Sequence, residues 1–188
     1  MAKQTFYTAY LLTRAKVNVQ TVPADRFPQV SLDFGGHVVP VRAYFHLLGQ
    51  LQRQPPQAVL YTIKLWPKTN PHGYLVPTSE LQSYRALGDP SKETFHALGK
   101  LAYVDRDEAR FGIQILPNSS GRLKKPFILS LSASLELLEQ LPKKGDGVEV
   151  WGEFRPRSLR IMVQRFKVVP LPPTPALPAK EAEPSPAH

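Results

Sequence analysis

The 188-residue sequence contains no cysteine, so it has no disulfide framework, no thiol nucleophile and no cysteine-based metal site. It also lacks any apolar run near the roughly 18 residues that a membrane-spanning helix needs. The N-terminal stretch MAKQTFYTAYLLTRAKVNV has only a short, tyrosine-rich apolar part, which is not the pattern of a cleaved signal peptide. These absences favour a cytoplasmic protein that does not enter a membrane.

Sequence patterns of common catalytic sites are absent as well. The chain contains no GxxxxGK followed by Ser or Thr, no GxSxG and no HExxH. An acidic cluster at Asp105, Asp107 and Glu108 offers oxygen ligands for Mg²⁺, but Arg106 and Arg110 beside it would neutralise these carboxylates. We interpret the cluster as a solvated turn, and we predict a protein that is not an enzyme and uses no metal or other cofactor.

Acidic residues are few compared with basic ones. The chain has 24 Lys and Arg against 15 Asp and Glu, which gives a net charge of +9. Residues 1–89 carry 9 basic and 4 acidic groups, and residues 90–169 carry 14 and 9, so each stretch has a net charge of +5. This balance predicts a polyanionic partner, either nucleic acid or an acidic membrane surface. The alternative is a soluble domain that is basic for no functional reason.

The C-terminal stretch PLPPTPALPAKEAEPSPAH differs in composition from the rest. It has 7 prolines in 19 residues and no apolar periodicity. Such a segment cannot bury enough apolar surface to offset the entropy of ordering. It predicts an extended, mobile tail that serves as a tether, a docking peptide or a solubilising end.

An internal repeat is the most informative pattern that is present. VVPVRAYFHLLGQL (Val38–Leu51) and ILSLSASLELLEQL (Ile128–Leu141) share Ala, Leu, Leu, Gln and Leu at matching positions. Earlier in each copy, TFYTAYLL (Thr5–Leu12) matches TFHALGKL (Thr94–Leu101). The shared order predicts one structural unit that is used twice.

The second copy shows the order of its elements clearly, because runs of alternating apolar and polar residues are separated by turn signals. Ser134 can cap a short helix whose leucines at 135, 138 and 141 lie on one face. We expect strands at Thr94–Val104, Phe111–Leu116 and Phe127–Leu131, a helix at Leu135–Leu141, and strands at Val148–Arg155 and Leu159–Val169. Three strands, a helix and two strands is the order of an OB-fold, a small barrel that commonly binds oligonucleotides or oligosaccharides.

Two longer motifs of the second copy match the pattern of a known family. HALGKLAYVDRDEARF (His96–Phe111) combines an apolar pair, Gly, a basic residue, Leu and an acidic turn. LPKKGDGVEVWGEFRPR (Leu141–Arg157) leads from the helix into the fourth strand. Both resemble the bacterial single-stranded DNA-binding protein family, and the first copy is connected to that family mainly through the repeat. The resemblance implies the tandem form of the family, in which two chains supply four barrels.

Two features depart from that family. Its usual acidic C-terminal tip, which recruits other proteins, has no counterpart in a chain that ends PSPAH. On the third strand, where the family often has aromatic stacking residues, this chain has Ser130, Ser132 and Ser134. Both the protein partners and the tightness of binding by the second copy are therefore left open.

Outward-facing aromatic and basic residues are the candidates for a groove that binds bases and phosphates. In the first copy, strand alternation turns Val59 and every second residue after it inward, and turns Lys64 and Trp66 outward. The loop that follows helps to frame the ligand in OB-folds, so Trp66-Pro67-Lys68 is the strongest candidate, with packing as the alternative. The candidates in this region are Lys64, Trp66, Lys68, His72 and Tyr74.

In the second copy, alternation points Trp151 outward between Glu149 and Glu153. Trp151 can stack on a base or pack at a barrel–barrel or subunit interface. The basic residues after Gly121 fit phosphate contact or simple solvation, and Tyr103 fits stacking or core packing. The candidates in this copy are Tyr103, Arg122, Lys124, Lys125, Trp151, Arg155 and Arg157.

These patterns predict an all-β-dominated fold of two tandem OB-fold barrels, each with five strands and a short helix between strands three and four. The first barrel spans residues 1–89, the second spans 90–169, and a Pro-rich disordered tail spans 170–188. We expect the protein to bind and protect single-stranded DNA in replication, recombination or repair, as a cytoplasmic homodimer. The rival hypotheses are an OB-fold protein-interaction module or structural subunit, and RNA binding.

Overall fold

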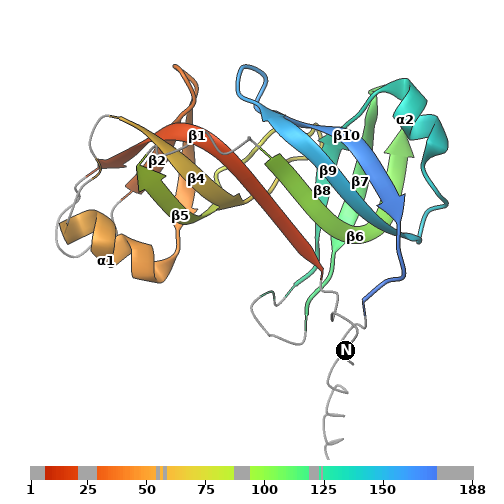
Figure 1. The fold of residues 1–188 in the computed structure, drawn as a ribbon, viewed down its shortest axis with the longest axis horizontal. Coiled ribbons are helices and arrows are strands. Elements are labelled where there is room, and N and C mark those ends of the chain that lie inside the picture. The colour runs from red at the N-terminus through yellow and green to blue at the C-terminus, as the bar shows by residue number, and fades with distance from the viewer. Residues whose placement is uncertain are drawn as a thin grey trace, which may run out of the picture.

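The computed structural model describes residues 7–20, 29–53, 56, 59–86, 94–118, 123 and 125–172. Most of them lie in strands, and two short helices interrupt the strands (Figure 1). The strands are β1 (Thr8–Gln20), β2 (Gln29–Asp33), β3 (Val38–Ala43), β4 (Leu60–Trp66), β5 (Glu80–Ala86), β6 (Thr94–Asp105), β7 (Arg110–Ile115), β8 (Phe127–Ser132), β9 (Gly147–Arg155) and β10 (Arg160–Val168), and the helices are α1 (Phe45–Arg53) and α2 (Leu135–Gln140). The predicted all-β-dominated class is confirmed.

The first five strands pair in a closed circuit. β1 pairs antiparallel with both β2 and β4, β2 pairs with β3, and β4 pairs with β5. A short parallel pairing between β3 and β5 completes the circuit. In the chain, α1 lies between β3 and β4. We call these five strands and α1 the first circuit.

The same pairing pattern recurs in the last five strands, which we call the second circuit. β6 pairs with β7 and β9, β7 with β8, and β9 with β10, all antiparallel, while β8 and β10 pair in parallel. α2 lies between β8 and β9, so the predicted order of three strands, a helix and two strands is confirmed. The predicted boundaries of this copy each lie within 1 residue of the observed ones.

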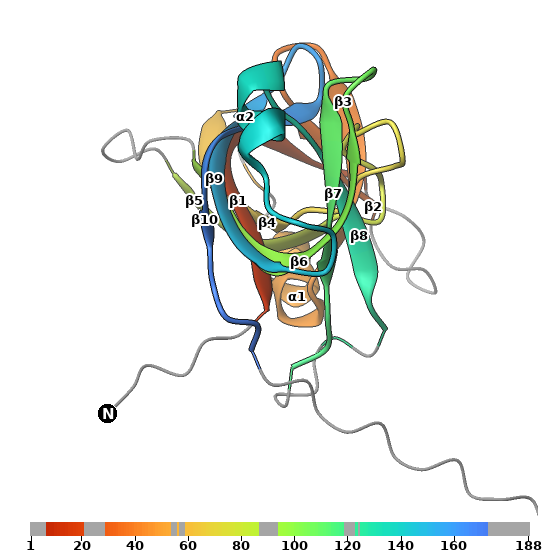
Figure 2. The same cartoon turned by 90° about the vertical axis from the view of Figure 1, so that its right-hand side faces the viewer.

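β1 also connects the two circuits. Thr8–Leu12 pairs antiparallel with Thr94–Leu98 of β6, so all ten strands belong to one hydrogen-bonded sheet. Figure 1 shows β1 running from the first circuit to the edge of β6, and Figure 2 shows the second circuit as an oval outline with α2 beside it. The rings of Phe34 and Phe154, from different circuits, have centroids 5.0 Å apart. Both rings are buried, so the two halves of the chain also share part of the core.

Alternation along the strands separates the core from the surface. On β1, every second residue from Ala9 to Val17 is buried, and on β9 the residues predicted to face inward, Val148 to Phe154, are buried as well. Val59 contradicts its prediction, because it is 44% exposed. The reason is that β4 begins at Leu60, so Val59 precedes the alternating run.

The start of α2 agrees with the sequence, but its buried face does not. Ser134 is the N-cap, and its Oγ accepts a hydrogen bond from the Leu137 N–H at 3.2 Å. Of the three leucines predicted on one face, Leu138 is buried, Leu141 is half-buried and Leu135 is 56% exposed. A helix of six residues makes fewer than two turns, so it presents little more than one side chain to the core.

No helix within the described part of the chain is long and apolar enough to cross a membrane. The same residues contain no group of three or more His, Asp or Glu side chains placed to hold a metal ion. At the acidic cluster, Arg110 Nη2 lies 3.2 Å from Asp105 Oδ2 and 3.8 Å from Glu108 Oε2. The arginine thus lies beside these carboxylates, as the sequence predicts.

Candidate functional site

Trp66 is the last residue of β4 and lies directly opposite Glu80, the first residue of β5. Its predicted outward direction is confirmed, because Tyr61, Ile63 and Leu65 on the same strand are buried while Trp66 is half-buried. The indole Nε1–H is buried and has no hydrogen-bond partner among the described residues. An unpaired donor of this kind is costly, which makes the surroundings of Trp66 the first place to look for a ligand.

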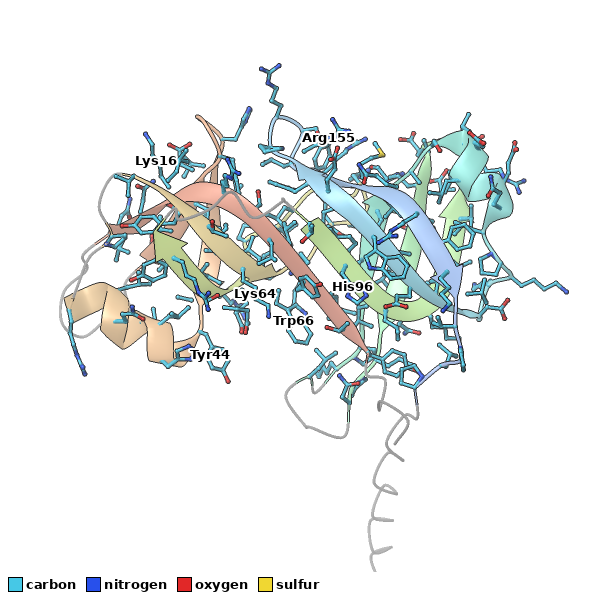
Figure 3. All side chains as sticks on the ribbon, in the orientation of Figure 1. Lys16, Tyr44, Lys64, Trp66, His96 and Arg155 are labelled. Atoms are coloured by element: carbon cyan, nitrogen blue, oxygen red, sulfur yellow. The ribbon has the colours of Figure 1, made fainter. Side chains whose placement is uncertain are left out.

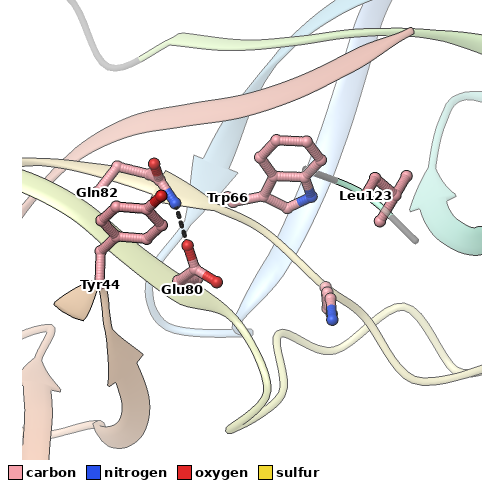
Figure 4. Close-up of a pocket in the computed structure, with 6 residues that line it drawn as sticks. Tyr44, Trp66, Glu80, Gln82 and Leu123 are labelled. Atoms are coloured by element: carbon pink, nitrogen blue, oxygen red, sulfur yellow. Dashed lines mark hydrogen bonds between the residues drawn. The ribbon is translucent and has the colours of Figure 1, made fainter. Parts of the chain in front are cut away.

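A cavity of about 260 Å³ opens beside Trp66. Figure 4 shows Trp66 and Leu123 on one side of it and the side chains of Tyr44, Glu80 and Gln82 on the other. It is smaller than the roughly 300–1,000 Å³ of pockets for drug-sized ligands, so it suits one flat ring. The lining residues are Tyr44, Trp66, Lys68, Glu80, Gln82 and Leu123.

The second circuit contributes to the same place. The rings of Trp66 and Phe127, the first residue of β8, have centroids 6.3 Å apart and are tilted by 49°. Lys68 Nζ lies 5.6 Å from the centroid of the Phe127 ring. Leu123, which precedes β8, lines the cavity itself. Aromatic side chains from both halves of the chain and a lysine from the first half therefore meet beside one cavity.

Hydrogen bonds hold Lys68 and the loop after it in place. The Lys68 N–H donates to Ser79 Oγ at 2.9 Å, and the Ser79 hydroxyl donates to the Lys68 carbonyl at 3.1 Å. Further along, the Asn70 side-chain oxygen accepts hydrogen bonds from the N–H groups of His72 and Tyr74, each at 3.0 Å. The loop is thus a folded turn with fixed positions for its candidate residues.

This loop of the first circuit lies against the second circuit. The Ser130 N–H of β8 donates to Thr69 Oγ1 at 2.7 Å, and Arg110 Nη1 donates to the Pro71 carbonyl at 2.5 Å. On the side of β10, the Leu75 N–H donates to the Leu159 carbonyl at 2.9 Å. The loop therefore bridges β8 and β10, which pair with each other only at Ser132 and Met162.

Two candidate residues of this loop have different surroundings. Tyr74 is exposed, but its hydroxyl accepts a hydrogen bond from Arg160 Nη2 at 3.0 Å, and the Arg160 guanidinium lies 4.5 Å from the centre of its ring. His72 is exposed. Tyr74 thus contributes to the contact between circuits, whereas His72 lies at the surface.

Tyr103 lies over the part of the second circuit that the loop reaches. It is half-buried, and its hydroxyl is 2.6 Å from Ser130 Oγ. Its ring covers Gly112, where a Cβ atom would come within 2.1 Å of it. Tyr103, Arg110 and Thr69 help to line a second cavity of about 380 Å³. Ser130 and Ser132 are buried, so the third strand of the second circuit presents neither serine to solvent.

Trp151 points outward from β9, as predicted, but its ring has close neighbours. The Arg165 guanidinium lies 4.7 Å from its centre, and the His96 ring lies 5.5 Å away. His96 Nε2 is 2.8 Å from Glu149 Oε1, and its ring is 5.2 Å from that of Tyr10. A row of outward side chains thus crosses several strands of the sheet. Its members are Lys64, Tyr10, His96, Trp151 and Arg165.

The remaining predicted candidates do not gather at the cavity. Arg155 and Arg157 are exposed at the turn between β9 and β10, and Arg155 forms an ion pair with Glu153. Figure 3 shows Arg155 near the top of the molecule and Trp66 in its lower half. Lys125 is exposed just before β8. The predicted candidates Arg122 and Lys124 lie outside the described residues.

Sequence reasoning missed several residues that the fold brings to these surfaces. Glu80, Gln82 and Leu123 line the cavity, and the signal available was that Glu80 and Gln82 share one face of a strand. No short-range pattern indicates that Leu123 approaches Trp66, because the contact crosses between circuits. Away from the cavity, burial raises the pKa of the Tyr84 phenol, and the nearby Tyr61 raises it further.

No protein-family model matches the chain, and no curated protein matches it in sequence. Among solved structures, the fold is similar to a deletion mutant of the single-stranded DNA-binding protein from Thermus aquaticus. The two share 15% sequence identity with a TM-score of 0.53, and the match covers 96% of this chain and 100% of that one. The likeness shows a shared fold, consistent with an OB-fold-like all-β class.

Proposed function

We propose that this protein binds single-stranded nucleic acid, with DNA favoured over RNA, and carries out no chemistry on it. In this proposal each circuit is an OB-fold barrel, with the division at residues 1–89 and 90–169. The observation that carries the proposal is the cavity where Trp66 and Lys68 of the first circuit meet Phe127 of the second. The net charge of +9 and the fold likeness support the same partner.

The proposed mechanism combines stacking with charge neutralisation. A base that stacks on Trp66 gains roughly 1–3 kcal/mol, whatever its identity, because every base has a π-face. Lys64 is exposed two residues before Trp66, and Lys68 lies two residues after it, so both can approach the phosphates on either side of that base. Binding then protects the strand. The affinity falls as the salt concentration rises, because binding releases counterions from the phosphates and their release is less favourable at high salt.

The row of side chains around Trp151 offers a second surface along which a bound single strand could continue from the Trp66 cavity. Tyr10 and His96 carry it from the first circuit to the second, and Arg165 lies at its far end. Glu149 lies within this row, and its charge opposes a phosphate there. We therefore assign the Trp66 cavity the main role and the Trp151 row a secondary one. The proposal also includes a homodimer, because the family resemblance implies one. It places the protein in the cytoplasm, in DNA replication, recombination or repair, on the same ground.

Fluorescence-anisotropy titration of labelled oligo-dT at two salt concentrations tests the proposal. Unlabelled duplex DNA and oligo-U serve as competitors. We expect binding that weakens with salt, resists duplex competitor and is displaced more weakly by oligo-U than by oligo-dT. Absence of binding at low salt would overturn the proposal, and stronger displacement by oligo-U would change the ligand to RNA.

A protein-interaction role is the second candidate, and one observation favours it. The loop from Thr69 to Leu75 lies against β8 and β10, so the second circuit already uses this surface to bind protein rather than an oligonucleotide. In that case oligo-dT would not bind in a salt-dependent way. A pull-down with the full chain would then recover a protein partner, and its loss on mutation of exposed residues would map the surface.

A further inference from the structure

The cavity beside Trp66 contains a carboxylate that a phosphate-binding track does not need. Glu80 lies directly opposite Trp66 across the β4–β5 pair, and both line the cavity. Cross-strand partners of this kind have Cβ atoms roughly 4.5–5.5 Å apart. A group that lies flat on the Trp66 ring therefore has one edge within reach of the Glu80 carboxylate.

The structure holds this carboxylate in place without neutralising it. Gln82, two residues further on the same face of β5, donates a hydrogen bond from Nε2 to Glu80 Oε1 at 2.5 Å. None of the ion pairs among the described residues involves Glu80. Lys68 lines the same cavity, but its Nζ lies over the Phe127 ring. The cavity thus combines aromatic faces with a charged hydrogen-bond acceptor.

A carboxylate repels phosphate, so its place in this cavity fits contact with the edge of a base. An ionised carboxylate only accepts hydrogen bonds, and it binds best to two adjacent donors. Guanine presents two adjacent donors on one edge, the N1–H and the N2 amino group. Thymine and uracil present a single N–H between two carbonyl oxygens, which the carboxylate repels. Cytosine and adenine each offer one amino group.

We infer that the Trp66 cavity selects guanine, with Glu80 reading its N1–H and N2 amino group while the ring stacks on Trp66. This inference rests on the proposed function and adds base selectivity to it. A bidentate contact of this kind typically discriminates between bases by about tenfold or more. The protein would therefore bind single strands of any sequence through phosphates and stacking, and would prefer to place a guanine in this cavity.

The test uses the full-length protein and short labelled dT oligonucleotides that differ at one central position. That position carries thymine, guanine, cytosine, adenine or hypoxanthine, and a single guanine avoids four-stranded structures. We expect the guanine oligonucleotide to bind about tenfold more tightly than the all-thymine one. Hypoxanthine keeps the N1–H and lacks the N2 amino group, so its affinity should be intermediate.

Glu80→Gln provides the matching protein variant. Removing the charge should reduce the preference for guanine to less than about twofold and should raise the affinity for the all-thymine oligonucleotide, because a repulsive group is lost. Loss of fold would lower the affinity for all oligonucleotides together. A smaller guanine preference combined with a higher affinity for the all-thymine oligonucleotide therefore identifies the proposed role of Glu80. Glu153→Gln is the control, because it removes the same charge on β9, where Glu153 pairs with Arg155.

The outcomes separate this inference from the function on which it rests. Equal affinity for all five oligonucleotides would overturn the guanine preference and leave single-strand binding intact. A guanine preference that survives Glu80→Gln would overturn the role of Glu80. If none of the oligonucleotides binds at low salt, both the proposed function and this inference are wrong.

Discussion

The two tryptophans of this protein lie on corresponding strands of the two circuits, and their surroundings differ. Trp66 on β4 borders a cavity of about 260 Å³ and has an unpaired indole N–H. Trp151 on β9 has the Arg165 guanidinium over its ring and His96 at its side. Strand alternation makes both rings point outward, but the neighbouring side chains decide which ring has space for a ligand. The comparison therefore predicts unequal roles.

The largest difference between the two sites should appear in the oligo-dT affinity when each tryptophan is replaced in turn. Trp66→Ala is expected to weaken binding of oligo-dT about 10- to 100-fold, since a stacked base contributes roughly 1–3 kcal/mol. Trp151→Ala is expected to weaken it less than about fivefold, because Arg165 already occupies one face of the ring. Anisotropy titrations measure both affinities, with thermal melts as the control for folding. A larger effect of Trp151→Ala would reverse the assignment of the main site.

The loop from Thr69 to Leu75, which joins the first circuit to the second, should also stabilise the protein. Thr69→Val keeps the side-chain shape but removes the acceptor of the Ser130 N–H. We expect the free energy of unfolding in urea to fall by about 1–3 kcal/mol, because a buried donor loses its partner. Thr78→Val, at an exposed position later in the connection between β4 and β5, is the matched control and should change the free energy of unfolding by less than about 0.5 kcal/mol. Equal effects would show that the loop contact contributes nothing.

Removing the Arg165 side chain from the Trp151 ring should make that ring more accessible to small molecules. In a Trp66→Phe background, Trp151 is the remaining tryptophan, and its fluorescence reports on its own surroundings. Arg165→Ala removes a cation–π contact worth about 0.5–1 kcal/mol, and we expect stronger quenching by acrylamide. Lys167→Ala, on the same strand, is the control. Unchanged quenching would mean that His96 and the strand itself cover the ring.

The smallest expected difference is in the salt dependence. Lys68→Gln should reduce the slope of log affinity against log salt by roughly 0.7, the value for one phosphate contact on a single strand. Arg157→Gln, at an exposed turn whose residues do not line the cavity, should change the slope by less. Titrations at several salt concentrations give both slopes. Equal slopes for the two variants would show that the charge acts over the whole surface rather than at the cavity.

Much of the fold was predictable from local patterns. The strands of the second copy follow their alternation to within 1 residue, and the Ser134 cap marks the start of α2. The wrong predictions concern residues at the ends of elements, where few neighbouring residues continue the periodic pattern. Val59 is exposed because β4 begins after it, and Leu135 is exposed because α2 is too short to bury its first turn.

The candidate site was predictable only in part. The outward direction of Trp66 and Trp151 follows from the alternation of their own strands. Placing Phe127 and Leu123 beside Trp66 requires contacts between residues about 60 positions apart, which no local pattern encodes. The hydrogen bond from the Ser130 N–H to Thr69 was unpredictable for the same reason, since Thr69 belongs to the other half of the chain.

By itself, the sequence determined the order of strands and helices, the repeat and the basic charge, because each depends on residue type and short-range periodicity. Only the tertiary structure decided that β1 pairs with β6, that a loop of the first circuit bridges β8 and β10, and that Glu80 faces Trp66 in a cavity shared by both circuits. The reason is physical. Alternation specifies which face of a strand is buried, whereas the neighbours of the other face depend on how distant strands pair.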